Sequence, residues 1–344
     1  MIIVQGTIKD SVDNLRRFLR RNLAGGADHL VVFLDGGAPD VEELLKAHDH
    51  VTCVRGYGKW WAGERPPNLN ARQSINATLT ARLLAEVDWA DWLFHVDGDE
   101  AVHLDRRALA ALPADQPGVL LRPLEVASHP QLTGEPVWFK RPLEPDELML
   151  LRLLGVVERG RNGRYFRGHT TGKVGVRPSS RLVPGIHRVL DRTGAEVPVP
   201  TDESLRVLHY ESETREEFIR KWLALKSSGP LVHQGRKREA LGAAIAALLR
   251  QELGEEETRH FLGALYDRTA VDDVDSLRRL GMLVHIDLET TPARAERLSD
   301  QARGQLEAML DRAGTVTKAR FHPRHRGDDV DEVVRSLRWD APGP

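Results

Sequence analysis

Short apolar runs alternate with amphipathic segments over the first 126 residues, and this alternation constrains the fold more than any other feature of the chain. The apolar runs predict strands, which cover residues 1–8, 29–35, 51–55 and 92–96. The segments between them predict helices over residues 10–26, 40–48 and 70–87. Because the strands are apolar throughout, the pattern predicts an α/β fold with a mainly parallel sheet flanked by helices. Ligands of such sheets bind at the carboxyl ends of the strands, here the segments "TIKD", "DGGAPD" and "DGDE".

The remainder of the chain has a different character. Residues 127–204 are irregular and rich in Pro, Gly and Arg, although 144–160 has a helical pattern. After Ser212 the sequence predicts mostly helices, at 214–228, 238–253, 255–268 and 293–314. Asp40 is the predicted N-cap of its helix, and the polar residues 321–344 are predicted to be a loosely held tail.

Composition excludes several classes of protein. Lys and Arg total 49 against 51 Asp and Glu, so the net charge is −2 and the chain lacks the basic field of a general nucleic-acid binder. The single cysteine, Cys53, excludes an internal disulfide and a cysteine-based zinc cluster. No apolar run reaches 18 residues, and the amino terminus has no basic start before a long apolar stretch. We therefore expect no transmembrane segment and no signal peptide, and hence a cytoplasmic protein, whose Ala-, Arg- and Leu-rich composition is typical of a bacterium.

Three carboxylates follow the last of these strands within four positions: Asp97, Asp99 and Glu100. Asp97 and Asp99 project to the same side if the chain stays extended, and Gly98 lets the backbone approach a ligand. Paired carboxylates at a strand end attract a divalent cation, and oxygen ligands favour Mg²⁺ or Mn²⁺. The simpler alternative is a polar turn that ends the strand and binds nothing. The position of the pair in an alternating α/β half favours the metal site.

The segment "DWLFHVDGDEAVHL" resembles the Asp-x-Asp segment of family-2-like glycosyltransferases with the GT-A fold, in particular bacterial members whose strand ends in a "DxDEF"-like run. Other segments are similar to that family: "TIKD" to the end of its first strand, "ADHLVVFLDGGAPD" to its second strand, "RQSINATLTAR" to the helix before the metal strand, and "GKVGVRPSSRLVPGIHRV" and "LRVLHYESETREEFIRKW" to later segments. The chain departs from the family at "IKD", where Asn-Glu is usual, and at Ala101 and Val102, where large apolar residues are usual.

The resemblance implies a GT-A-like domain over residues 1–225, with a nucleotide-binding half at 1–126 and an acceptor half at 127–225. The helical region 226–320 and the tail 321–344 carry no motif of the family. The implied enzyme is a hexosyltransferase that moves a sugar from a nucleoside-diphosphate sugar to an unidentified acceptor, with inversion at the anomeric carbon.

The resemblance also implies roles for individual residues. Asp97 and Asp99 would bind the Mn²⁺ or Mg²⁺ that stabilises the diphosphate leaving group, although Asp97 could instead reach the ribose. A later histidine, His209 or else His187, would complete the metal site. Other residues would bind the nucleotide sugar at the strand ends and along the helix before the metal strand: Lys9, Asp10, Asp35, Gln73 and Asn76.

Basic residues near the expected site could bind phosphate. Lys173, Arg177 and Arg181 form a basic cluster in the sequence, and Arg72 begins the helix beside the metal strand. Solvation of the protein surface is the alternative role for each of them.

The general base that an inverting transferase needs is less well defined by the sequence. Glu100 is the first candidate, and Glu211 and Glu213 are rivals. The paired indoles of Trp60 and Trp61 lie in a predicted loop, where they could stack on a sugar or be buried under a helix.

Other functions are compatible with an alternating sheet and paired carboxylates. A nucleotidyltransferase would normally have a Gly-rich phosphate loop after the first strand, where "QGTIKD" has one Gly. A catalytically degenerate GT-A-fold binding protein is a second alternative, which the intact Asp97 and Asp99 pair opposes. A phosphoryl-transfer enzyme of the haloacid-dehalogenase kind ranks last, because Asp10 lies past the end of the first strand.

Overall fold

The computed structural model describes residues 1–158, 162, 164–227, 235–291, 295–323, 325 and 330–337. The chain divides into two compact units. Unit 1 comprises Met1–Pro123, Thr170–Leu208 and Leu288–Pro344, and unit 2 comprises Leu124–His169 and His209–Asp287. Both units are built from segments that are distant in the sequence, unlike the contiguous division at residue 225 that the resemblance implied.

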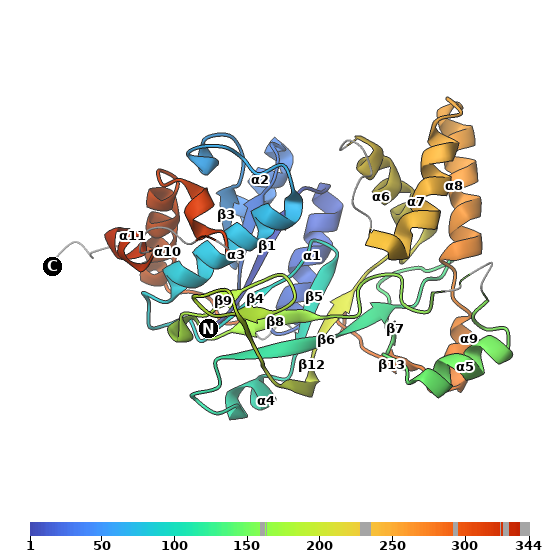
Figure 1. The fold of residues 1–344 in the computed structure, drawn as a ribbon, viewed down its shortest axis with the longest axis horizontal. Helices are drawn as coiled ribbons and strands as arrows, with labels where there is room; N and C mark the ends of the chain where they lie inside the picture. The colour runs from blue at the N-terminus through green and yellow to red at the C-terminus, as the bar shows by residue number, and fades with distance from the viewer. Residues whose placement is uncertain are drawn as a thin grey trace. The chain divides into compact units, whose positions relative to one another are not determined.

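The core of unit 1 is a sheet whose strands are mostly parallel (Figure 1). The first strand, β1 (Ile2–Ile8), pairs in parallel with β2 (His29–Leu34) and with β4 (Trp92–His95), and β2 pairs in parallel with β3 (Val51–Arg55). On the other side of β4 lies the antiparallel strand β8 (Lys173–Val176). The predictions of an α/β fold and of strands at these places are confirmed.

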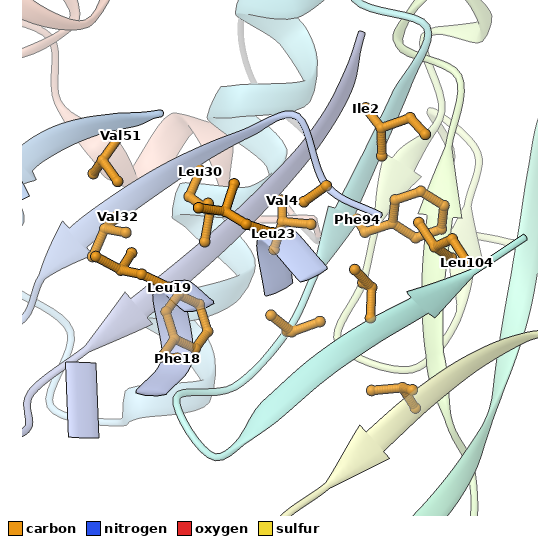
Figure 2. Close-up of a cluster of buried hydrophobic side chains, with 14 of the residues drawn as sticks. Ile2, Val4, Phe18, Leu19, Leu23, Leu30, Val32, Val51, Phe94 and Leu104 are labelled. Atoms are coloured by element: carbon orange, nitrogen blue, oxygen red, sulfur yellow. The ribbon is translucent and has the colours of Figure 1, made fainter. Parts of the chain in front are cut away.

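Helices cover both faces of this sheet, and the alternation of side chains along the strands shows which helix covers which face. Figure 2 shows Val4, Leu30 and Val32 packed with Phe18 and Leu19 of helix α1 (Val12–Ala24), and helix α2 (Pro39–Lys46) belongs to the same hydrophobic cluster. The alternate strand residues pack against helices α3 (Leu69–Leu84), α10 (Asp300–Ala313) and α11 (Val330–Ser336). Unit 1 is thus a helix–sheet–helix sandwich.

Shorter elements complete unit 1. Strand β6 (Gly118–Val126) pairs with β8 through residues 118–121, and β5 (Glu100–Leu104) pairs with β12 (Thr201–His209). Both β6 and β12 start in unit 1 and end in unit 2. The other short elements are η1 (Gly58–Trp61), α4 (Arg106–Ala111), η2 (Pro178–Ser180), β9 (Val183–Pro184), β10 (Val189–Leu190), β11 (Glu196–Val197) and η3 (Lys318–Phe321).

Unit 2 combines a small antiparallel sheet with helices. Strand β7 (Trp138–Lys140) pairs with the end of β6 and with β13 (Leu283–His285). One hydrophobic cluster joins α6 (Arg215–Ser227), α7 (Gly235–Leu249) and α8 (Glu255–Thr269), and another joins α5 (Pro145–Leu153) to α9 (Val274–Arg279). None of the helices in the described parts of the chain has both the length and the apolar character needed to cross a membrane.

Several details of the predicted elements are wrong. The N-cap of α2 is Ala38, and Asp40 lies inside the first turn because Pro39 takes the first helical position. Helix α10 begins at Asp300, later than predicted, because Ser299 caps it by accepting from the Ala302 N–H. The predicted helix at 144–160 ends at Leu153, and residues 159–161 lie outside the described residues.

The tail is also better anchored than predicted. Phe321 is 1% exposed and belongs to the cluster beneath α3, together with Val334 of α11 and Leu337. Asp331 of α11 accepts a hydrogen bond from Arg82 of α3. The described part of the segment 321–344 therefore belongs to the core of unit 1.

Candidate functional site

The candidate site lies where the order of the parallel strands reverses. Along the sheet the order is β4-β1-β2-β3, so β2 and β3 follow β1 on one side and β4 lies on the other. Ligands of open α/β sheets bind outside the carboxyl ends of the strands at such a reversal. Asp10, Asp35 and the Asp97–Asp99 turn directly follow β1, β2 and β4. The predicted carboxylates therefore share one edge of the sheet, at the position that the topology favours for a ligand.

The carboxylate of Asp97 is held by groups from two other elements. Gln73 of α3 donates from Nε2 to Asp97 Oδ1 at 2.6 Å, and Lys173 donates from Nζ to Asp97 Oδ2 at 2.7 Å. Antiparallel pairing brings Lys173, the first residue of β8, to the carboxyl end of β4. The approach of the strands requires Gly175, because a Cβ there would lie 2.2 Å from the Phe94 ring. Asp97 thus has a fixed orientation.

Glu100 closes the turn and shares Lys173 with Asp97. Its Oε2 accepts the Asp97 N–H at 2.8 Å and lies 3.2 Å from Lys173 Nζ. Burial alone would lower the pKa of Lys173, but the carboxylates of Asp97 and Glu100 raise it above the ordinary value. A buried ammonium therefore offsets the repulsion between two of the three carboxylates. Glu100 is 2% exposed, which suits an anchor of the turn better than a base that a substrate must reach.

A chain of buried polar side chains lies behind Asp97, in the interior of unit 1. His95 Nδ1 is 2.8 Å from Gln5 Oε1, and Gln5 donates from Nε2 to Thr7 Oγ1 at 3.3 Å. Asn76 of α3 donates to the same hydroxyl at 3.0 Å and accepts from Trp60 Nε1 at 3.3 Å. Burial, followed by the charge of Lys173, lowers the pKa of His95 to about 4, so the imidazole is neutral near pH 7.

Asp35 at the end of β2 is held by arginines. Arg72 donates from Nε to Asp35 Oδ1 at 2.8 Å and from Nη2 to Asp35 Oδ2 at 2.7 Å, a bidentate pair. Arg65 adds a bond of 2.9 Å to Oδ1. Arg72 also donates from Nη1 to the carbonyls of Pro66 and Pro67, both at 2.8 Å. Arg72 therefore positions Asp35, in place of the phosphate contact expected from the sequence.

An open pocket of about 690 Å³ lies along α2, at the ends of β2 and β3, and Asp35 is not among its lining residues. Its lining includes Gly37, Pro39, Arg55 and Tyr57. The volume falls within the range of small-ligand sites in proteins. Of the two roles left open for Trp60 and Trp61, the structure shows burial, because the two indoles are 7% and 1% exposed and pack in the core.

The residues after β1 have different surroundings. Asp10 Oδ1 accepts from the Ser11 N–H at 2.7 Å and from Asn14 Nδ2 at 2.8 Å, so Asp10 stabilises the start of α1. Lys9 is exposed, and its aliphatic chain lies over Gly36, the residue after Asp35. Of this pair, Lys9 is the residue whose charged end is available at the edge of the sheet.

The predicted basic cluster does not form. Lys173 lies at the carboxyl end of β4, whereas Arg177 follows the far end of β8 and its guanidinium carbon is 4.4 Å from the centre of the Trp92 ring. Arg181 pairs with Glu86 after the end of α3. An antiparallel strand separates the residues at its two ends, so Lys173 and Arg177 cannot bind the same phosphate.

The histidines expected to complete a metal site belong to different units. His187 lies in unit 1, with Nδ1 2.8 Å from the Gly172 carbonyl oxygen. His209 lies in unit 2, 3.7 Å from Glu125 and 3.7 Å from Glu211, which also pairs with Lys221 at 2.9 Å. A joint role of His209 with Asp97 and Asp99 stays a prediction.

No protein-family model matches this chain, and no curated protein matches it. The site therefore has to be interpreted from its own chemistry.

The donor set at the end of β4 fits a divalent cation. Each carboxylate oxygen has two lone pairs, so Asp97 can bind a cation while it keeps the hydrogen bonds from Gln73 and Lys173. Asp99 is partly exposed on the same turn. The three carboxylates and the Lys173 ammonium together carry a charge of −2, which one divalent cation neutralises. Oxygen ligands at such a turn suit Mg²⁺ or Mn²⁺.

Sequence reasoning missed the polar chain behind Asp97 and the part played by Arg65. A usable signal was present, because Gln5, Thr7 and His95 are polar residues inside otherwise apolar strands. Polar groups in a buried strand need hydrogen-bond partners, so they indicate an internal network.

Proposed function

We propose that the protein is a metal-dependent glycosyltransferase with a GT-A-like fold, which transfers a sugar from a nucleoside-diphosphate sugar to an acceptor with inversion. The observation that carries the proposal is the Asp97–Asp99 turn at the strand-order reversal, where Lys173, Gln73 and Glu100 fix one carboxylate and leave the other partly exposed. A polar turn that only ended a strand would not need such an arrangement.

The surroundings of the turn also support a nucleotide ligand. Arg72 and Arg65 present Asp35 in a fixed orientation at the end of β2, and Tyr57 lines an open pocket at the ends of β2 and β3. A carboxylate held in this way can accept hydrogen bonds from ribose hydroxyls or from a base, and an aromatic ring can stack on the base. Lys9 provides a positive charge at the same edge for a phosphate.

The chemistry requires negative charge to be stabilised on the diphosphate as the glycosidic bond breaks. A divalent cation held by Asp97 and Asp99 would supply that stabilisation as a Lewis acid. Lys173 and Gln73 would hold the Asp97 carboxylate and Glu100 would hold its backbone N–H, so that no rearrangement is needed when the donor binds. Glu100 is a positioning residue in this scheme, and the general base has to come from elsewhere in the chain.

Differential scanning fluorimetry with UDP-, GDP- and TDP-sugars, each with and without Mn²⁺, tests the proposal. We expect one nucleotide sugar to raise the melting temperature only when Mn²⁺ is present. Asp99→Asn should abolish that increase, because the amide removes one negative charge from the metal site. Asp13→Asn is the matched control, since Asp13 is an exposed carboxylate on α1.

The proposal fails if none of the nucleotide sugars raises the melting temperature in a metal-dependent way. Retention of the full increase in the Asp99→Asn variant would place the metal elsewhere. Release of nucleoside diphosphate from the stabilising donor, followed by ¹H NMR of the anomeric proton, then tests transfer and its stereochemistry.

A further inference from the structure

His95 has an unusual environment for a histidine inside a strand. Its side chain is 0% exposed, and Nδ1 lies 2.8 Å from Gln5 Oε1. Within the described parts of the chain, no hydrogen-bond partner is found for the other nitrogen, Nε2. Leaving a buried polar atom without a partner is unfavourable, so the position of Nε2 calls for an explanation.

The hydrogen bonds around Gln5 determine which nitrogen of His95 carries the proton. Gln5 uses its amide Nε2 to donate to Thr7 Oγ1, and it therefore presents its carbonyl oxygen to His95. Since that oxygen can only accept, His95 must donate from Nδ1. The other ring nitrogen, Nε2, is therefore the one that can offer a lone pair to a metal ion.

This lone pair faces the candidate metal site. His95 Nε2 lies 3.9 Å from Asp97 Oδ1, whereas Lys173 occupies the side of the other oxygen, Oδ2. Two atoms that bind one ion at about 2.1 Å each are separated by about 3 Å when they are adjacent and by at most about 4.2 Å. The observed separation is within that span.

We propose that His95 Nε2 is a ligand of the divalent cation, together with Asp97 and Asp99, and that Gln5 orients it. Histidine ligands typically donate their other ring N–H to a fixed acceptor, which sets the tautomer and the ring orientation, and Gln5 is such an acceptor. The inference rests on the proposed function only for the position of the metal site at Asp97 and Asp99. It can be tested without any nucleotide sugar.

A nitrogen ligand changes the expected choice of metal. Mg²⁺ prefers an all-oxygen shell, whereas Mn²⁺, Co²⁺ and Zn²⁺ accept imidazole, and affinities of mixed sites increase from Mn²⁺ to Co²⁺. The site should therefore bind Mn²⁺ and Co²⁺ more tightly than Mg²⁺. The preference for Co²⁺ over Mg²⁺ should be larger than at a site with oxygen ligands alone.

The experiment uses the full chain and Mn²⁺ alone. Pulsed EPR of the Mn²⁺ complex reports a directly bound ¹⁴N through its modulation of the electron spin echo, and titration calorimetry gives the affinity. We expect the ¹⁴N modulation in the wild type and its replacement by a ¹⁵N pattern when only histidine is labelled with ¹⁵N. His95→Gln should abolish the modulation and weaken Mn²⁺ binding by at least about 10-fold.

Matched variants separate a ligand from a residue that is merely structural. His187→Gln and His209→Gln remove the alternative histidines and should retain the ¹⁴N modulation. Gln5→Ala leaves the imidazole but removes its acceptor, so it should weaken Mn²⁺ binding by about 10- to 100-fold and keep the modulation. Gln5→Ala also keeps the test decisive if His95→Gln does not fold.

The outcomes distinguish this inference from the proposed function. The inference is overturned if the wild type binds no Mn²⁺, if the wild-type spectrum lacks ¹⁴N modulation, if folded His95→Gln retains it, or if Gln5→Ala binds Mn²⁺ as tightly as the wild type. Metal-dependent binding of a nucleotide sugar without ¹⁴N modulation would overturn the inference and leave the transferase proposal intact. Nitrogen coordination of Mn²⁺ without binding of any nucleotide sugar would support His95 as a ligand and contradict the transferase proposal.

Discussion

Replacement of Lys173 by methionine tests whether a buried ammonium holds the carboxylate turn together. The Lys173 side chain is 0% exposed, and its Nζ lies 2.7 Å from Asp97 and 3.2 Å from Glu100. Methionine has a similar length and no charge, so the change removes the ammonium and leaves the surrounding packing nearly filled. Glu100 would then be a buried carboxylate without its cation.

The magnitude follows from burial and distance. At an effective dielectric constant of about 20, each attraction is on the order of 5 kcal/mol, and the cost of burying the ammonium offsets much of their sum. Asp97 is 29% exposed and regains solvation when Lys173 is removed, so Glu100 dominates the loss. Removal of one partner from a buried ion pair costs about 3–5 kcal/mol, and we expect Lys173→Met to lower the free energy of unfolding of unit 1 by that amount.

Urea unfolding followed by tryptophan fluorescence, to which the buried Trp60 and Trp61 of unit 1 contribute, measures the change. Lys59→Met is the control, because Lys59 is exposed and its replacement should change stability by less than about 0.5 kcal/mol. The double variant Lys173→Met with Glu100→Gln should recover part of the loss, since it removes the uncompensated charge as well. A loss below about 1 kcal/mol in Lys173→Met would refute the assigned role of the ammonium.

Unit 2 and the carboxyl-terminal segment provide further predictions. Burial alone would raise the pKa values of Glu125 and Asp272, but Lys140 and Arg167 among other groups hold both below their ordinary values. Their stabilising contribution is present above the unfolded-state pKa values and is lost as the pH falls below about 4. The protection of the β7 amides from exchange, relative to the intrinsic rate at each pH, should therefore fall there, and less steeply in Glu125→Gln than in the wild type. Phe321→Ala should destabilise unit 1 by about 3–5 kcal/mol in urea unfolding. Phe261→Ala is the control and should cost much less, because Phe261 is 45% exposed. Equal losses in the two variants would contradict the anchoring of the tail.

The sheet of unit 1 could be predicted because its signals are local. Continuous apolar runs define β1, β2, β3 and β4, and the amphipathic segments between them define the helices that connect parallel strands. Right-handed parallel connections and the polar strand ends then place Asp35 and Asp97 on the same edge without any knowledge of distant contacts.

The bounds of the units could not be predicted in the same way. Unit 1 recruits 170–208 and 288–344 through pairing of β8 with β4 and through packing of α10 and α11 on α3. These are contacts between segments more than 70 residues apart, and neither periodicity nor capping residues report them. The polar composition of 321–344 suggested a loose tail, although Phe321, Val334 and Leu337 are the residues that bury it.

Charged residues at the site show the limit of sequence reasoning most clearly. The sequence shows that cations and carboxylates are present, but the structure decides which of them meet. Lys173 and Arg72 were both expected to bind phosphate, yet one is held by Asp97 and Glu100 and the other by Asp35. A buried cation beside a carboxylate is held by that carboxylate before any ligand arrives, because the cost of its desolvation must already be offset in the folded chain. The proposed metal ligand His95 shows the same limit, because in the sequence it is a single polar residue inside an apolar strand, and only the folded chain brings its Nε2 to 3.9 Å from Asp97.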